Sequence, residues 1–106
     1  MLVVEMADKK NKTVGRRLRH LRRSLNYQHA NTFAHSLGIS DNRWRNLENG
    51  YPLGKEVAFL LVQKIPGLSL DWLYYGRNEG LSIRLGQRLG EFPDEPPPSR
   101  RNSTTS

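Results

Sequence analysis

The sequence predicts a small all-α protein, and its 106 residues suit a single domain. An apolar residue recurs at intervals of four, three and four, the spacing of one face of an amphipathic helix. The positions are Val14, Leu18, Leu21 and Leu25. Pro66-Gly67 and Gly76 provide helix stops later in the chain. A helix ending at Gly38 and another starting at Ser40 complete the pattern.

A tight corner between two short helices is predicted at residues 37–40. Gly38 can adopt the left-handed conformation that ends one helix, and Ser40 can cap the free N–H groups of the next. The second of these helices should cover about residues 40–49, because Asn49-Gly50 tolerates the geometry of a helix C-terminus. The corner therefore sets a short, anchored helix against its neighbour.

The helix over residues 40–49 has two different faces. A turn of about 100° per residue places Trp44 and Leu47 on one side, where we expect them to join the core. The other side carries a row of asparagines at Asn42, Asn46 and Asn49. Arg43 and Arg45 flank that row. Amides pair with adenine edges and arginines bind guanine edges or phosphates, so this composition is typical of a DNA-reading helix.

Several motifs in order resemble the lambda-repressor-like, or Cro/cI-type, helix-turn-helix family, also called the xenobiotic-response-element family. They are Arg17-Leu18-Arg19-His20-Leu21-Arg22, Phe33-Ala34, Leu37-Gly38-Ile39-Ser40, Leu47-Glu48-Asn49-Gly50 and Leu68-Ser69-Leu70-Asp71-Trp72-Leu73. Each motif is common alone, and their order makes the match more specific. The resemblance covers residues 14–76 and implies a compact five-helix domain that binds double-stranded DNA as a transcriptional regulator, a repressor in particular.

The resemblance and the asparagine row together predict roles for single residues. Asn42 and Asn46 would read base edges in the major groove, and Asp41 would accept a hydrogen bond from a cytosine amino group. Phosphates would be held by Arg43, Arg45 and Asn49. A two-fold homodimer would read half-sites about 10 bp apart. The alternative is that the three asparagines are merely solvated, although asparagine is a poor helix former.

Two further positions are assigned through the resemblance. In the family, an arginine at the place of Arg22 pairs with the glutamate near the end of the third helix, which here is Glu48. The family also starts its second helix with a phosphate-binding glutamine, and this chain has Ala30 there. Gln28 stands two residues upstream, so either it reaches the phosphate by another path or this contact is missing.

The charge is strongly basic but lies away from the predicted reading helix. The net charge of +7 and the pI near 10.3 favour a polyanionic partner. Residues 1–25 alone contribute +6, whereas residues 26–76 balance to zero. Asp41 and Glu48 offset Arg43 and Arg45. The arginines at 16, 19 and 23 are expected on a solvated face of the first helix.

The ends of the chain are predicted to be less ordered than its middle. Residues 1–12 lack periodicity and should be mobile, with Thr13 as the N-cap of the first helix. The helix-turn-helix domain covers 13–76, and a turn and a short helix follow over 77–90. Residues 91–106 form a proline-rich tail expected to be disordered. The short helix has an apolar stripe that either packs back or contacts a dimer mate or partner: Leu81, Leu85 and Leu89.

Other functions have weaker support in the sequence. No phosphate-binding glycine loop, nucleophile motif or carboxylate pair occurs, so we expect neither an enzyme nor a cofactor. His20, His29 and His35 lack acidic residues at metal-ligand spacing, and no metal is expected. The chain has no cysteine, no apolar run of membrane-spanning length and no signal peptide, which suits a cytoplasmic protein with no membrane partner.

A second functional hypothesis remains open. The chain could keep this fold but bind another transcription regulator or a toxin protein, as an antiactivator or antitoxin. The neutral reading helix, the missing glutamine at Ala30 and the unassigned stripe at Leu81, Leu85 and Leu89 favour it. Salt would separate the two hypotheses, because phosphate contacts weaken steeply with ionic strength and apolar interfaces do not.

Overall fold

The computed structural model describes the backbone of residues 2–90 and the side chains of residues 10–90. This part of the chain is all-helical, with six helices and no strand, as the sequence predicts. The helices are α1 (Leu2–Ser24), α2 (Ala30–Leu37), α3 (Asp41–Glu48), α4 (Lys55–Lys64), α5 (Leu70–Tyr75) and α6 (Ile83–Leu89). The predicted tail over 91–106 lies outside the described residues.

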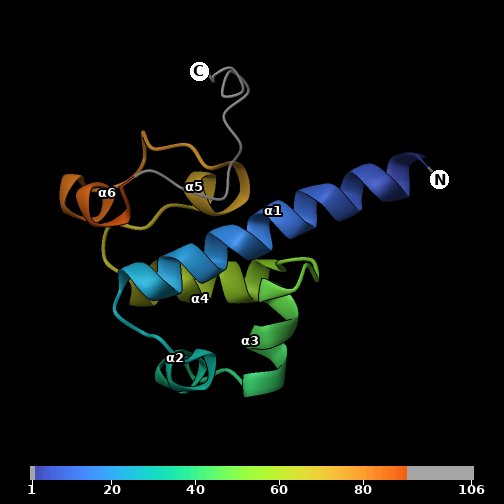
Figure 1. The fold of residues 1–106 in the computed structure, drawn as a ribbon. Helices are drawn as coiled ribbons and strands as arrows, with labels where there is room; N and C mark the ends of the chain where they lie inside the picture. Colours follow the sequence, from blue (N-terminus) through green and yellow to red (C-terminus); the bar gives the residue numbers. More distant parts are fainter. Residues whose placement is uncertain (1, 91–106) are drawn as a thin grey trace, which may run out of the picture.

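Helix α1 is the central element of the domain. Figure 1 shows it crossing the whole molecule, with α2 and α3 on one side and α5 and α6 on the other. It contacts α3, α5 and α6 directly, while α4 packs on α2 and α5. None of the helices in the described region combines the length and the hydropathy that a bilayer span needs. One long helix thus connects the two halves of the fold.

Helix α1 begins at Leu2, so the prediction that the first helix starts at Thr13 is wrong, whereas the expected mobility of residues 1–12 stays a prediction. Residues 2–12 contain no glycine or proline, and leucine, methionine, alanine, glutamate and lysine extend a nucleated helix at little cost. Thr13 lies inside the helix and is not its N-cap; its hydroxyl accepts a hydrogen bond from Arg16 at 3.5 Å. The first turns of α1 extend beyond the other helices (Figure 1).

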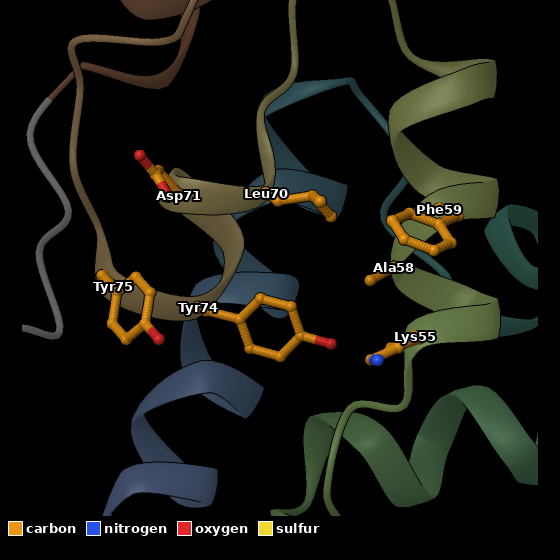
Figure 2. Close-up of a pocket in the computed structure, with 7 residues that line it drawn as sticks. All are labelled: Lys55, Ala58, Phe59, Leu70, Asp71, Tyr74 and Tyr75. Atoms are coloured by element: carbon orange, nitrogen blue, oxygen red, sulfur yellow. The ribbon is translucent and has the colours of Figure 1, made fainter.

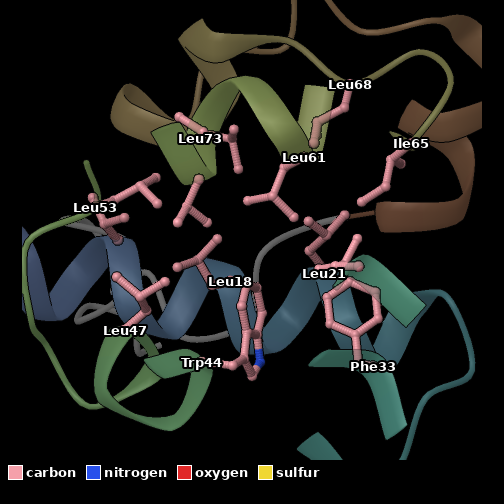
Figure 3. Close-up of a cluster of buried hydrophobic side chains, with 14 of the residues drawn as sticks. Leu18, Leu21, Phe33, Trp44, Leu47, Leu53, Leu61, Ile65, Leu68 and Leu73 are labelled. Atoms are coloured by element: carbon pink, nitrogen blue, oxygen red, sulfur yellow. The ribbon is translucent and has the colours of Figure 1, made fainter. Parts of the chain in front are cut away.

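The core lies between α1 and the helices around it. Leu18 and Leu21 from the predicted stripe of α1 are fully buried against residues of α4 and α5 such as Leu61 and Leu73, as Figure 3 shows. At its lower edge the ring of Trp44 meets that of Phe33 at a centroid distance of 5.0 Å and an angle of 72°. Such edge-to-face pairs add to the energy of apolar burial. Trp44 and Trp72 are both core residues, as expected.

Helix α6 packs back onto α1. Of the two options that the sequence left open for its apolar stripe, the partner or dimer contact is therefore wrong. Leu85 and Leu89 are buried and Leu81 packs beside them, so this stripe is not an exposed partner or dimer surface. Two polar contacts fasten the helix end: the His20 ring lies 2.7 Å from the carbonyl oxygen of Leu89, and Arg88 donates to that of Ser24 at 2.7 Å. The C-terminal halves of both helices are thereby joined.

The buried side chain of Arg17 connects α1 to α5. Arg17 is 2% exposed and donates from Nη1 to the carbonyl oxygen of Leu73 at 3.0 Å. That carbonyl belongs to the last turn of α5, where a positive charge interacts favourably with the helix dipole. Arg17 therefore holds α5 against α1.

Gly15 allows the closest approach of α1 to α3. A Cβ atom at this position would lie 2.6 Å from the carbonyl oxygen of Glu48 and 2.8 Å from that of Leu47. Real Cβ atoms do not approach backbone oxygens so closely, so α3 would have to move. The glycine thus sets the distance between the central helix and the predicted reading helix.

We predict opposite effects of alanine at two helical glycines. Gly15→Ala should lower the free energy of unfolding by about 1 to 3 kcal/mol, because it overpacks the α1–α3 contact. Gly86→Ala in α6 meets no atom within 4 Å and should stabilise by up to about 1 kcal/mol through helix propensity. Urea denaturation followed by circular dichroism measures both. Equal effects at the two sites would contradict the proposed close approach.

Candidate nucleic-acid interface

The corner between α2 and α3 is built from the two residues that the sequence indicates. Gly38 has φ of 78°, and its N–H group and that of Ile39 close the end of α2 on the carbonyl oxygens of His35 and Ala34, at 3.1 and 2.9 Å. Ser40 then accepts a hydrogen bond on Oγ from the Arg43 amide at 3.2 Å. This pair of caps sets the start of α3 directly after the end of α2.

Helix α3 divides into a buried and an exposed face. Trp44, Leu47 and Glu48 are buried, whereas Asp41 is half-buried. Five of the residues predicted to contact DNA are exposed: Asn42, Arg43, Arg45, Asn46 and Asn49. These five residues therefore lie on the exposed side of a helix whose opposite side is fixed in the core, whereas Gln28, also predicted to bind phosphate, lies on the loop before α2.

A buried carboxylate fixes this orientation. Arg22 and Glu48 form an ion pair in which Nε donates to Oε2 at 2.7 Å and Nη2 donates to Oε1 at 3.3 Å. The indole Nε1 of Trp44 donates to the same Oε2 at 2.6 Å. Arg19 approaches from the rim, with its Nε 3.5 Å from Oε1. Three hydrogen bonds and the nearby Arg19 charge thus stabilise a carboxylate that burial would otherwise destabilise strongly.

Two of these contacts were not predicted from the sequence. Arg19 was expected on the solvated face of α1, yet it lies beside Glu48, because one helical turn separates it from the Arg22 position. The bond from Trp44 to Glu48 joins two residues four apart on α3. That spacing was visible in the sequence and could have suggested the bond.

Arg22 also holds the loop in front of α2. Its Nη1 donates to the carbonyl oxygens of Tyr27 and Gln28 at 2.9 and 2.8 Å. The Gln28 side chain is exposed and precedes the start of α2 at Ala30 by two residues. His29, the N-cap residue, makes no side-chain hydrogen bond to the helix. The same guanidinium therefore positions α3 and the N-terminus of α2.

Both exposed arginines of α3 face an acid. Arg45 Nε lies 3.2 Å from Oδ1 of Asp41, one turn earlier in the helix. Arg43 Nη2 lies 3.3 Å from Oε1 of Glu56 in the first turn of α4. Glu56 was not predicted as part of this surface, since no local spacing in the sequence relates it to Arg43. The free surface is rich in hydrogen-bonding groups and nearly balanced in charge.

A second surface feature is an apolar groove between α4 and α5, with a volume of about 410 Å³. Figure 2 shows Lys55, Ala58 and Phe59 of α4 on one side and Leu70 and Tyr74 of α5 on the other. The groove is further lined by Asp71 and Tyr75. Phe59 and Tyr75 are 54% and 56% exposed, so the groove presents two aromatic residues to solvent.

The two tyrosines of the groove differ in their surroundings. The Tyr74 hydroxyl donates to the carbonyl oxygen of Leu53 at 2.8 Å, and burial, with a smaller contribution from Tyr75, raises the pKa of Tyr74. Two cations lie near the Tyr75 ring, with Lys10 Nζ and Arg77 Cζ at 5.7 and 5.1 Å from the ring centroid. The groove is thus aromatic, with a basic rim.

Comparison with known proteins adds no assignment. No family model matches the chain, and searches of curated proteins and of solved structures find no match either. The chemistry of the described surface must therefore be read from its residues. The amides and guanidinium groups of α3 can donate and accept hydrogen bonds at fixed positions, which suits recognition of a polar partner.

We predict that Glu48→Gln lowers the free energy of unfolding by about 2 to 4 kcal/mol, because it leaves the buried Arg22 guanidinium without its counter-charge. Urea denaturation with tryptophan fluorescence measures the change. Glu79→Gln removes an exposed carboxylate between α5 and α6 and should shift stability by less than about 0.5 kcal/mol. A loss at Glu48 as small as that at Glu79 would show that the pair contributes no net stability.

Proposed function

We propose that this chain is a sequence-specific DNA-binding regulator of transcription, acting as a repressor, with α3 as its reading helix. The observation that carries the proposal is the exposed face of α3. Five amide or guanidinium side chains project from a helix whose opposite face is locked into the core. A helix of about 10 Å diameter fits the major groove, where such side chains pair with base edges.

Each polar residue of the reading face has a role in the proposed mechanism. Asn42 and Asn46 form hydrogen bonds with base edges, and Asp41 accepts from a cytosine amino group. Phosphates are bound by Arg43, Arg45 and Asn49. To do so, the two arginines exchange their carboxylate partners for phosphate oxygens.

The N-terminus of α2 supplies a second phosphate contact in this proposal. Helix N-termini attract anions, and α2 starts without a side-chain cap from His29. Gln28 is exposed beside it, on a loop whose carbonyls Arg22 holds. A phosphate between α2 and Gln28 would replace the contact that the family makes through the glutamine at the Ala30 position.

Basic side chains outside the reading face would speed the encounter with DNA rather than recognise bases. Lys10, Lys12 and Arg23 of α1 are exposed and basic. Long-range attraction of this kind raises the rate at which a protein meets DNA and depends strongly on salt. The proposed complex is a two-fold dimer on half-sites about 10 bp apart, so that both reading helices face one side of the duplex.

We predict that Asn46→Ala weakens binding to the preferred duplex by about 1 to 3 kcal/mol and relaxes selectivity at one base pair. The preferred duplex is obtained by selection from random DNA at physiological salt, and affinities are measured by fluorescence anisotropy. Asn78→Ala is the matched control, since Asn78 is exposed in the turn after α5. If the selection recovers no motif, or if both variants bind all sequences as the wild type does, direct reading by α3 is excluded.

The alternative function is binding of another regulator or a toxin protein. Leu85 and Leu89 are buried, but the α4–α5 groove is an apolar surface that favours this alternative, and Phe59 and Tyr75 are exposed there. Exposed aromatic side chains often anchor protein interfaces.

The α4–α5 groove gives this alternative its own prediction. Phe59→Ser should abolish capture of a partner protein, without changing DNA binding, if the chain acts through the groove. Partner binding should also persist from about 50 to 500 mM salt, since apolar contacts are little screened. Capture that survives Phe59→Ser would place the partner elsewhere on the surface.

A further inference from the structure

Glu56 faces the proposed reading helix from a different element. It is the second residue of α4, and its Oε1 lies 3.3 Å from Nη2 of Arg43. We propose that Glu56 limits the affinity of α3 for DNA by competing with the phosphate backbone for Arg43. This inference rests on the proposed DNA-binding function and adds to it a residue outside the helix-turn-helix that sets the strength of phosphate binding.

The position of the pair indicates that it is not needed to hold the fold. The side chains of Arg43 and Glu56 are 56% and 87% exposed, in contrast to the buried pair of Arg22 and Glu48. Exposed pairs of long side chains contribute little to stability, because water screens them and both side chains lose rotamer freedom. Glu56 can therefore be neutralised without disturbing the orientation of α3.

Competition follows from where the two charges lie. The Arg43 guanidinium is on the free surface of α3, so a phosphate that approaches it also approaches the Glu56 carboxylate. The phosphate must displace that carboxylate and then remain near a charge of its own sign. Binding is weakened, and one cation fewer is available to release counterions from DNA.

The second pair on this surface cannot isolate the effect. Asp41 faces Arg45 within the same helix, and it is also a proposed base-reading residue. Changing it would alter reading and electrostatics together. Glu56 belongs to α4 and has no proposed contact with a base, so its substitution tests competition for phosphate alone.

The test compares Glu56→Gln with Glu79→Gln, which changes the net charge equally but at a site between α5 and α6. Both are titrated against the selected duplex from about 50 to 200 mM salt. We expect Glu56→Gln to bind about threefold more tightly than Glu79→Gln at the lowest salt. We also expect its plot of log K against log salt concentration to be steeper by about 0.9, the value for one more phosphate neutralised.

A double-mutant cycle with Arg43→Gln identifies the partner of Glu56. In the Arg43→Gln background, Glu56→Gln and Glu79→Gln should bind DNA equally, because no guanidinium remains to be released. If the advantage of Glu56→Gln persists there, Glu56 acts through the general field and the proposed competition is wrong.

The outcomes separate this inference from the function on which it rests. A wild-type chain that selects a motif, together with equal affinities of Glu56→Gln and Glu79→Gln, would overturn the role of Glu56 and leave the DNA-binding proposal intact. A wild-type chain without sequence preference would overturn both.

Discussion

The orientation of α3 depends on the carboxylate of Glu48, a charge held almost entirely out of water. Apolar contacts of Trp44 and Leu47 bury one face of α3, but the hydrophobic effect is not directional. The side-on bonds from Arg22 have a single geometry and fix the angle of the helix. Because Arg22 also binds the loop before α2, both helices of the corner take their position from one guanidinium on α1.

Three of the 17 basic side chains are used inside the fold, which changes how the net charge should be interpreted. Arg17 and Arg22 are buried and bonded to backbone or carboxylate oxygens, and Arg19 contacts Glu48. These side chains count toward the total of +7 but contribute little to a field that DNA would feel. The exposed amide and guanidinium groups of α3 therefore support the proposed nucleic-acid partner more strongly than the pI does.

Local features of the fold could be predicted from the sequence, and long-range ones mostly could not. The corner depends on two residue types, Gly38 and Ser40, whose preferences act over a few bonds. The pair of Arg22 and Glu48 spans 26 residues and came only from family resemblance. From the sequence, the apolar stripe of α6 indicated that one face of this helix is apolar. It did not indicate which helix packs against that face. Likewise, Glu56 joins the candidate site through the packing of α4, which no local spacing reveals.

Because the stripe of α6 is buried, the protein-partner hypothesis depends on the α4–α5 groove, which adjoins the surface proposed to bind DNA. The α4–α5 groove is lined from Lys55 onward, and the next residue is Glu56, which faces Arg43. Neighbouring residues in the first turn of α4 thus line the groove and face the proposed reading surface. A protein partner seated in the groove would change the charge environment of Lys55, and over so short a distance that change reaches the pair of Glu56 and Arg43. If a partner in the groove changes the affinity of the other surface, linkage requires that a ligand on that surface change the affinity of the groove by the same factor.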